Sequence, residues 1–86
     1  MHIVFSKRFK KRHGRLGLEL QNKFRNRLML LLEDKGHPLL NIHLLNGQYL
    51  GCQSLNVTGD VRAIFEIQKD EEVILFMNIG THSELY

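Results

Sequence analysis

Two stretches decide the fold of this chain: DVRAIFEIQ at positions 60–68 and VILFMN at positions 73–78. In the first stretch, apolar residues at every second position from Val61 to Ile67 alternate with Arg62, Ile64 and Glu66. This period of two predicts a strand whose apolar set faces the helices. The second stretch is apolar on both faces, which predicts an interior strand.

The rest of the chain supplies the other elements of an α+β domain. The pattern predicts strands at 2–5 and 49–57, helices at 7–12 and 18–34, and an irregular loop at 37–48. Ser6 is the expected N-cap of the first helix, Gly14 is expected to end it, and Gly36 is expected to end the second. We therefore predict one domain over residues 1–86, of order β-α-α-β-β-β, with an antiparallel sheet covered on one face by two helices.

Composition limits the class of protein. Cys52 is the single cysteine in 86 residues, so no internal disulfide can form. The first residues lack the apolar core of a signal peptide, and the run Leu28–Leu32 is too short to span a bilayer. We therefore expect a cytoplasmic protein. No spacing of metal ligands and no phosphate-loop glycine pattern occurs in the sequence, so we expect neither a metal nor a cofactor.

Charge is divided unevenly along the chain. The net charge is only +3, but basic residues gather in the first third and acidic residues in the second half. This distribution favours a basic face that follows a phosphate backbone. The alternative is that these charges only solvate two helices. The basic residues expected to contact RNA are Lys7, Lys10, Lys11, Arg12 and Arg15.

Polar groups suited to chemistry lie near the ends of the predicted strands. They are His43, Asn56, Asp60, Arg62 and His82. Asp60 and Arg62 are two apart on one predicted strand, so they share a face. If that face points away from the helices, it forms an open polar concavity.

Each of these groups has a functional and a structural interpretation. The guanidinium of Arg62 suits a phosphate and its transition state, but it could instead pair with Asp60 or Glu66. Asn56 and Asp60 could orient a ribose or a histidine, whereas Asp60 could equally serve the turn beside Gly59.

The two histidines and the last aromatic residue have similar alternatives. His43 and His82 can act as general base or acid near neutral pH, although a lone loop histidine is more often a surface residue. Tyr86 can stack on a splayed base, or it can pin this end of the chain to the core.

Three segments resemble motifs of the RelE/YafQ-type toxins, which belong to the RelE/ParE superfamily of toxin–antitoxin proteins. They are His43–Gly51 for H-x-L-x-G-x-x-x-G, Gly59–Phe65 for G-D-x-R-x-I-[YF], and Gly80–Tyr86 for G-T-H-S-[DE]-L-[FY]. The segments occur in the order and spacing of that family, and the resemblance extends over essentially the whole chain.

The resemblance implies a ribosome-dependent mRNA endonuclease, or mRNA interferase, that needs no metal. In such toxins the ribose 2′-hydroxyl attacks the adjacent phosphate while the message occupies the A site of the 70S ribosome. The resemblance implies that His43 and His82 are catalytic histidines, Asp60 an acidic site residue, Arg62 the strand arginine and Tyr86 the terminal aromatic. It also implies a cognate antitoxin protein as a partner.

Two positions depart from the family pattern. The YafQ branch usually has a histidine where this chain has Asn56, and often an arginine where it has Asn78. These departures leave open a catalytically reduced, RNA-binding member. A ParE-like inhibitor on the same fold that binds DNA gyrase is a separate alternative. A gyrase-binding protein has no need of the set His43, Arg62 and His82, which favours the nuclease.

Overall fold

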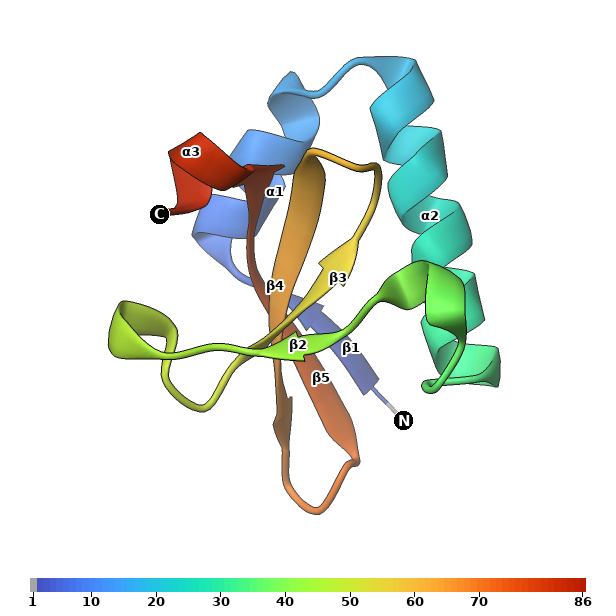
Figure 1. Ribbon diagram of the computed structural model, residues 1–86, viewed down its shortest axis with the longest axis vertical. Coiled ribbons are helices and arrows are strands. Elements are labelled where there is room, and N and C mark those ends of the chain that lie inside the picture. The colour runs from blue at the N-terminus through green and yellow to red at the C-terminus, as the bar shows by residue number, and fades with distance from the viewer. Residues whose placement is uncertain (1) are drawn as a thin grey trace.

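A five-stranded sheet forms the centre of the molecule in the computed structural model, which describes residues 2–86. The strands lie in the order β1-β5-β4-β3-β2 (Figure 1). Their bounds are His2–Phe5 for β1, His43–Leu44 for β2, Gln53–Asn56 for β3, Val61–Gln68 for β4 and Val73–Thr81 for β5. β1 is parallel to β5, and the other neighbouring pairs are antiparallel. The predicted meander and the interior position of β5 are therefore confirmed, but the prediction of a wholly antiparallel sheet is wrong for β1, because the helices that follow β1 return the chain to the sheet as a crossover.

Two helices cover one face of the sheet, as the sequence predicts. They are α1, Lys7–Arg15, and α2, Leu18–Glu33. The shorter elements are the 3₁₀ turns η1, Pro38–Leu40, and η2, Gly47–Tyr49, and the terminal helix α3, His82–Leu85. The hydroxyl of Ser6 caps α1 by accepting a hydrogen bond from the Phe9 N–H at 3.1 Å. The predicted α+β class is confirmed.

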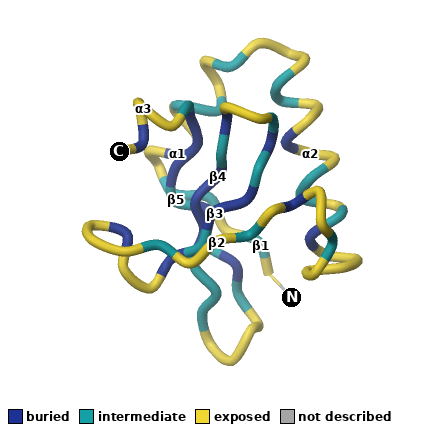
Figure 2. Tube along the Cα trace, in the orientation of Figure 1, coloured by how far each residue is buried: buried dark blue, intermediate teal, exposed yellow. Residues whose placement is uncertain are grey.

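Aromatic residues fill the core between the helices and the sheet. The ring centroids of Phe9, Phe24 and Phe76, from α1, α2 and β5, lie 5.2 to 5.6 Å apart. Phe65 of β4 contacts the same cluster, 5.6 Å from Phe76. Burial follows the sheet, while the outer side of α2 and the loops are exposed (Figure 2). The larger of two buried clusters thus lies between the helices and one face of the sheet.

The first helix is longer than predicted. It continues through Gly14 and ends at Arg15, with Leu16 as its C-cap. One glycine costs a helix only about 1 kcal/mol relative to alanine. Packing of Phe9 on the core outweighs that cost, so the glycine does not end α1.

The region between α2 and β4 also differs from the prediction. The predicted strand at 49–57 is wrong at its start, because Tyr49 belongs to η2 and β3 begins only at Gln53. Within the predicted loop, His43–Leu44 forms the edge strand β2. Gly47 and Gly51 have positive φ angles of 63° and 89°, which L side chains rarely adopt and which turn the chain between β2 and β3.

The strand bounds matter for one candidate residue. β4 begins at Val61, so Asp60 lies in the preceding turn and is not on a strand with Arg62. β5 extends three residues beyond the prediction, to Thr81. None of the helices within residues 2–86 is long and apolar enough to cross a membrane.

Candidate functional site

The face of the sheet opposite α1 and α2 presents two rows of side chains, and we call it the open face. Leu55, Ala63 and Ile79 pair across β3, β4 and β5 and belong to the core beneath the helices. Because side chains alternate along a strand, their neighbours point to the other side. The first row is His43, Ser54, Ile64 and Asn78, and the second is Asn56, Arg62 and Gly80.

Arg62 lies in the second row, between Asn56 and Gly80. It is half-buried, and the ion pair with Asp60 or Glu66 that was its structural alternative does not form within residues 2–86. His43 lies two strands away, on β2, and one row further along, so it is about 12 Å from Arg62 in the sheet. The structure therefore places Arg62 beside Asn56 but does not bring it next to His43.

His82 and Tyr86 stand at one end of this face, on α3. Val61 of β4 pairs with Thr81 of β5, and α3 starts immediately after that pair. The rings of His82 and Tyr86 lie 4.8 Å apart. Leu85 is buried in a second apolar cluster on the open face, so α3 folds back over the sheet. The short helix therefore holds both rings at the margin of the face that contains Arg62.

Asp60 joins this end of the sheet from a turn. The hydroxyl of Thr58 accepts hydrogen bonds from the N–H groups of Asp60 and Val61, at 3.2 and 3.0 Å. Thr58 thus performs the turn chemistry that was the structural alternative for Asp60. Asp60 and His82 both adjoin the terminal Val61–Thr81 pair of the ladder, and the Asp60 side chain is exposed.

Two buried polar atoms on the open face have no partner within residues 2–86. They are the Oγ of Ser54 and the Oδ1 of Asn56. A buried acceptor without a partner costs free energy, so both atoms are suited to receive a hydrogen bond from a ligand or a water. Asn56 lies directly beside Arg62 in the second row.

Asn78, by contrast, is fully used inside the protein. Its side chain is only 3% exposed. The Nδ2 group donates to the hydroxyl of Tyr49 at 3.1 Å, and Oδ1 accepts from the N–H of Ile79 at 2.9 Å. Asn78 is uncharged, and its amide is bonded within the protein, at the position where the YafQ branch often has an arginine.

The arginines of α1 flank the same end of the sheet. Arg12 and Arg15 line a hollow of about 280 Å³ together with Gly80 and Glu84. Any Cβ at position 80 would lie 3.3 Å from Nη1 of Arg12 and 3.0 Å from the Glu84 carboxylate, so only glycine fits there without movement. Hydrogen bonds from Thr81, and the charge of Arg12, lower the pKa of Glu84.

Arg8 lies one helical turn before Arg12 on α1 and is absent from the predicted RNA-binding set. It lines a groove of about 220 Å³ with Tyr49 and Met77, next to the open face. Arg8, Arg12 and Arg15 follow helical spacing, which was a usable signal in the sequence. The predicted lysines Lys7, Lys10 and Lys11 are exposed on α1. Of these, Lys10 borders a different groove, beside Phe5, Phe9, His13 and Phe24.

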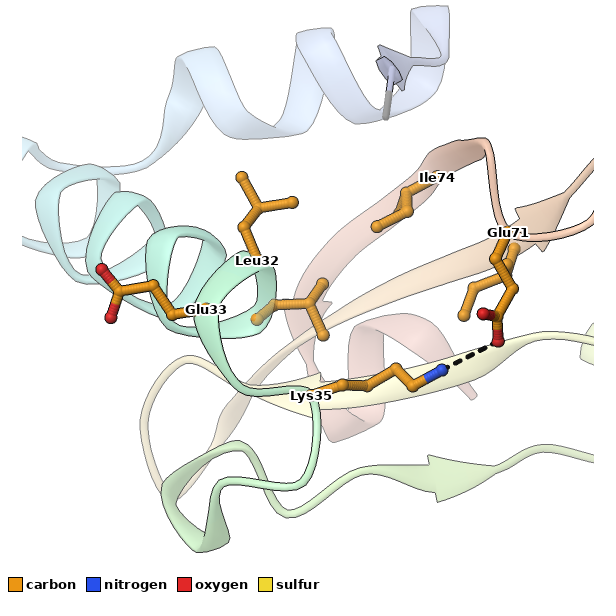
Figure 3. A pocket seen from close by; sticks show the side chains of 7 residues that line it. Leu32, Glu33, Lys35, Glu71 and Ile74 are labelled. Carbon is orange, nitrogen blue, oxygen red and sulfur yellow. Dashed lines mark hydrogen bonds and ion pairs between the residues drawn. The ribbon is translucent and has the colours of Figure 1, made fainter.

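An apolar hollow lies at the far end of α2, away from these residues. Leu31, Leu32 and Ile74 line it, and Lys35 and Glu71 form an ion pair of 3.0 Å at its edge (Figure 3). It contains none of the predicted site residues. Within residues 2–86 no group of three or more His, Cys, Asp or Glu side chains could hold a metal ion.

Comparison with known proteins gives the family. A family model for YafQ, a bacterial toxin of type II toxin–antitoxin systems, matches residues 1–86. The chain belongs to this family. It is thus a toxin of a type II toxin–antitoxin system, and the resemblance to RelE/YafQ-type toxins is confirmed.

Solved structures agree with the YafQ assignment. YafQ from E. coli strain BL21(DE3) superposes with a TM-score of 0.80 at 21% identity, covering 98% of this chain and 96% of that one. A YoeB/ParE toxin from Agrobacterium tumefaciens gives 0.80 at 14% identity, covering 95% and 99%. The E. coli DinJ–YafQ complex gives 0.76 at 22% identity, covering 98% and 96%. At these identities the likeness shows the fold. No curated protein sequence matches the chain.

Proposed function

We propose that this YafQ-family toxin is a metal-independent endoribonuclease that cuts mRNA in the A site of the 70S ribosome. The observation that supports the proposal best is the position of Arg62. It is half-buried on the open face and unpaired within residues 2–86, beside an Asn56 oxygen that has no partner there. α3, with His82 and Tyr86, stands at the margin of that face.

The proposed reaction is an internal transesterification. The ribose O2′ attacks the adjacent phosphorus while a base takes its proton, and a five-coordinate phosphorane forms. The bond from phosphorus to O5′ then breaks as an acid protonates O5′. The products are a 2′,3′-cyclic phosphate, which can hydrolyse to a 3′-phosphate, and a 5′-hydroxyl.

In this proposal each side chain has a role that follows from its chemistry. His43 and His82 are the base and acid, since imidazole can exchange protons near neutral pH. Arg62 stabilises the extra negative charge of the phosphorane through its planar fork. Tyr86 stacks on a base of the message, and Asp60 orients His82 at the end of the ladder.

Binding to the ribosome would use the basic helix. Lys7, Lys10, Lys11, Arg12 and Arg15 contact RNA phosphates in the proposal, and Arg8 joins them. A cognate antitoxin would cover the basic or active face, and a solved toxin–antitoxin complex of DinJ and YafQ supports such a partner. These partners imply a cytoplasmic site of action.

The test compares purified variants on translating ribosomes programmed with one message. Arg62→Ala and His82→Ala should each slow cleavage by about 100-fold or more. Arg25→Ala on α2 and His2→Ala on β1 are matched controls, because both residues are exposed and lie outside the site. Variants of Arg62 and His82 that cut as fast as the parent would refute the site assignment.

The two other functions predict different outcomes in the same assay. A ParE-like toxin would leave the message intact and inhibit purified DNA gyrase. A catalytically reduced member would bind ribosomes without cutting, and the internal use of Asn78 is the observation that favours it. Mapped cuts by the parent would exclude both.

A further inference from the structure

A loop between β2 and β3 folds over the open face and contacts α3. We call residues 45–52 the arm. Its two ends are joined by a hydrogen bond from the Leu45 N–H to the Cys52 carbonyl, 3.0 Å long. Gly47 and Gly51, both with positive φ, bound the turn that presents Tyr49. In Figure 1 the arm and α3 lie on the left, and α2 lies on the right.

Tyr49 is the main contact between the arm and the rest of the protein. It is only 9% exposed and shares a buried cluster with Cys52, Ile64 and Leu85. Its ring meets the ring of Tyr86 edge-on, with centroids 5.8 Å apart and planes at 89°. Its hydroxyl accepts the hydrogen bond from Asn78, so both ends of the side chain are fixed.

Gln48 adds a second connection from the arm to α3. Its Nε2 group donates to the carbonyl of Leu85 at 3.3 Å. That carbonyl lies at the C-terminal end of α3, where a helix has no internal partners for its C=O groups. α3 is a single turn of four residues, and the capping box of Thr81 and Glu84 satisfies N–H groups at its start but no C=O group at its end. The arm therefore supplies the contacts that α3 lacks at its other end.

A helix as short as α3 is not stable by itself in water. We propose that Tyr49 is a positioning residue that holds α3, and with it His82 and Tyr86, against the open face. This inference rests on the nuclease function proposed above. The ring of Tyr49 packs on Leu85 and Tyr86, and its hydroxyl fixes the ring through Asn78.

The experiment compares Tyr49→Leu, Tyr49→Phe and Gln48→Ala with the parent. Leu50→Ala is the matched control, because Leu50 is on the same arm and 75% exposed. Misplacement of a reacting group by about 1 Å can cost about 100-fold in rate. Tyr49→Leu should therefore slow single-turnover cleavage on ribosomes by about 100-fold, while its affinity for ribosomes changes less than about threefold.

Tyr49→Phe and Gln48→Ala should lie between Tyr49→Leu and the parent. Phenylalanine restores the ring and so most of the rate, but it leaves the Asn78 amide without its partner. Thermal unfolding shows whether each variant is folded. If Tyr49→Leu does not fold, Tyr49→Phe and Gln48→Ala provide the test.

A second readout does not depend on cleavage. The Tyr86 N–H bonds to the His82 carbonyl at 3.0 Å across α3. Its hydrogen exchange, measured by NMR, should become at least about tenfold faster in Tyr49→Leu, with β4 amides unchanged. Unchanged exchange at Tyr86 would overturn the inference, whether or not the rate falls. A parent protein that does not cut would refute the nuclease function, and the exchange data would still decide whether Tyr49 holds α3.

Discussion

The hydroxyl of Ser6 joins the first helix to the last strand, and its removal should destabilise the fold. Ser6 Oγ accepts the Phe9 N–H at 3.1 Å and donates to the carbonyl of Met77 at 2.9 Å. Alanine at this position removes both hydrogen bonds without changing the volume of the core. Ser6→Ala therefore isolates the connection between α1 and β5.

The two bonds give the expected size of the effect. Loss of a serine N-cap costs about 1 kcal/mol. Loss of the bond to the Met77 carbonyl costs about 1 kcal/mol more. The free energy of unfolding should thus fall by about 2 kcal/mol, which corresponds to a decrease of about 8 to 16 °C in Tm for a domain of this size.

Urea unfolding followed by circular dichroism measures this change directly. The slope of free energy against urea should stay constant, since the surface exposed on unfolding is the same. Ser83→Ala is the matched control, because Ser83 is exposed. Its hydroxyl has one long contact, 3.4 Å to the hydroxyl of Thr81. A loss below about 0.5 kcal/mol in Ser6→Ala, no larger than a surface substitution, would refute the reasoning.

Three further predictions concern single side chains. Burial raises the pKa of the Cys52 thiol, so its reaction with Ellman's reagent at neutral pH should be about 100-fold slower in the folded protein than in urea. Hydrogen bonds from Thr81 lower the pKa of Glu84, so its carboxylate stabilises α3 above the ordinary carboxyl pKa of about 4.3 and this contribution is lost as the pH falls further. NMR shifts of α3 should then change as the pH falls below about 4.3 in the parent, and this change should be absent in Glu84→Gln. Arg8→Ala should weaken ribosome binding and reduce the slope of log affinity against log salt by about 1, whereas Lys23→Ala on α2 should not.

Most of the fold could be predicted because periodic burial determines it. The alternation along β4, the apolar β5 and the cap at Ser6 are local patterns, and each predicted its element correctly. The arm differs from the prediction because the apolar residues around Tyr49 favour a strand locally, whereas β3 begins only at Gln53. Gly47 and Gly51 were the available signal, since two glycines four apart favour a turn over a strand.

The candidate site was harder to predict, because it depends on contacts between distant segments. Tyr49 and Asn78 are 29 residues apart, and no local pattern links them. The sequence predicts a strand from Asp60 because the segment continues without a break into Arg62. In the structure the turn that Thr58 stabilises includes Asp60, and β4 begins at the next residue, Val61. The row of Arg8, Arg12 and Arg15 could have been found from helical spacing alone.

The parallel pairing of β1 with β5 has a consequence for how the molecule is made. Ser6, at the end of β1, and its partner Met77 are separated by 71 residues, so the first strand emerges from the ribosome long before its neighbour is synthesised. During that interval the helices α1 and α2 lack the strand β5 on which they pack. The sheet can therefore be completed only after β5 has been synthesised, and folding of the domain depends on its most distant strand pair.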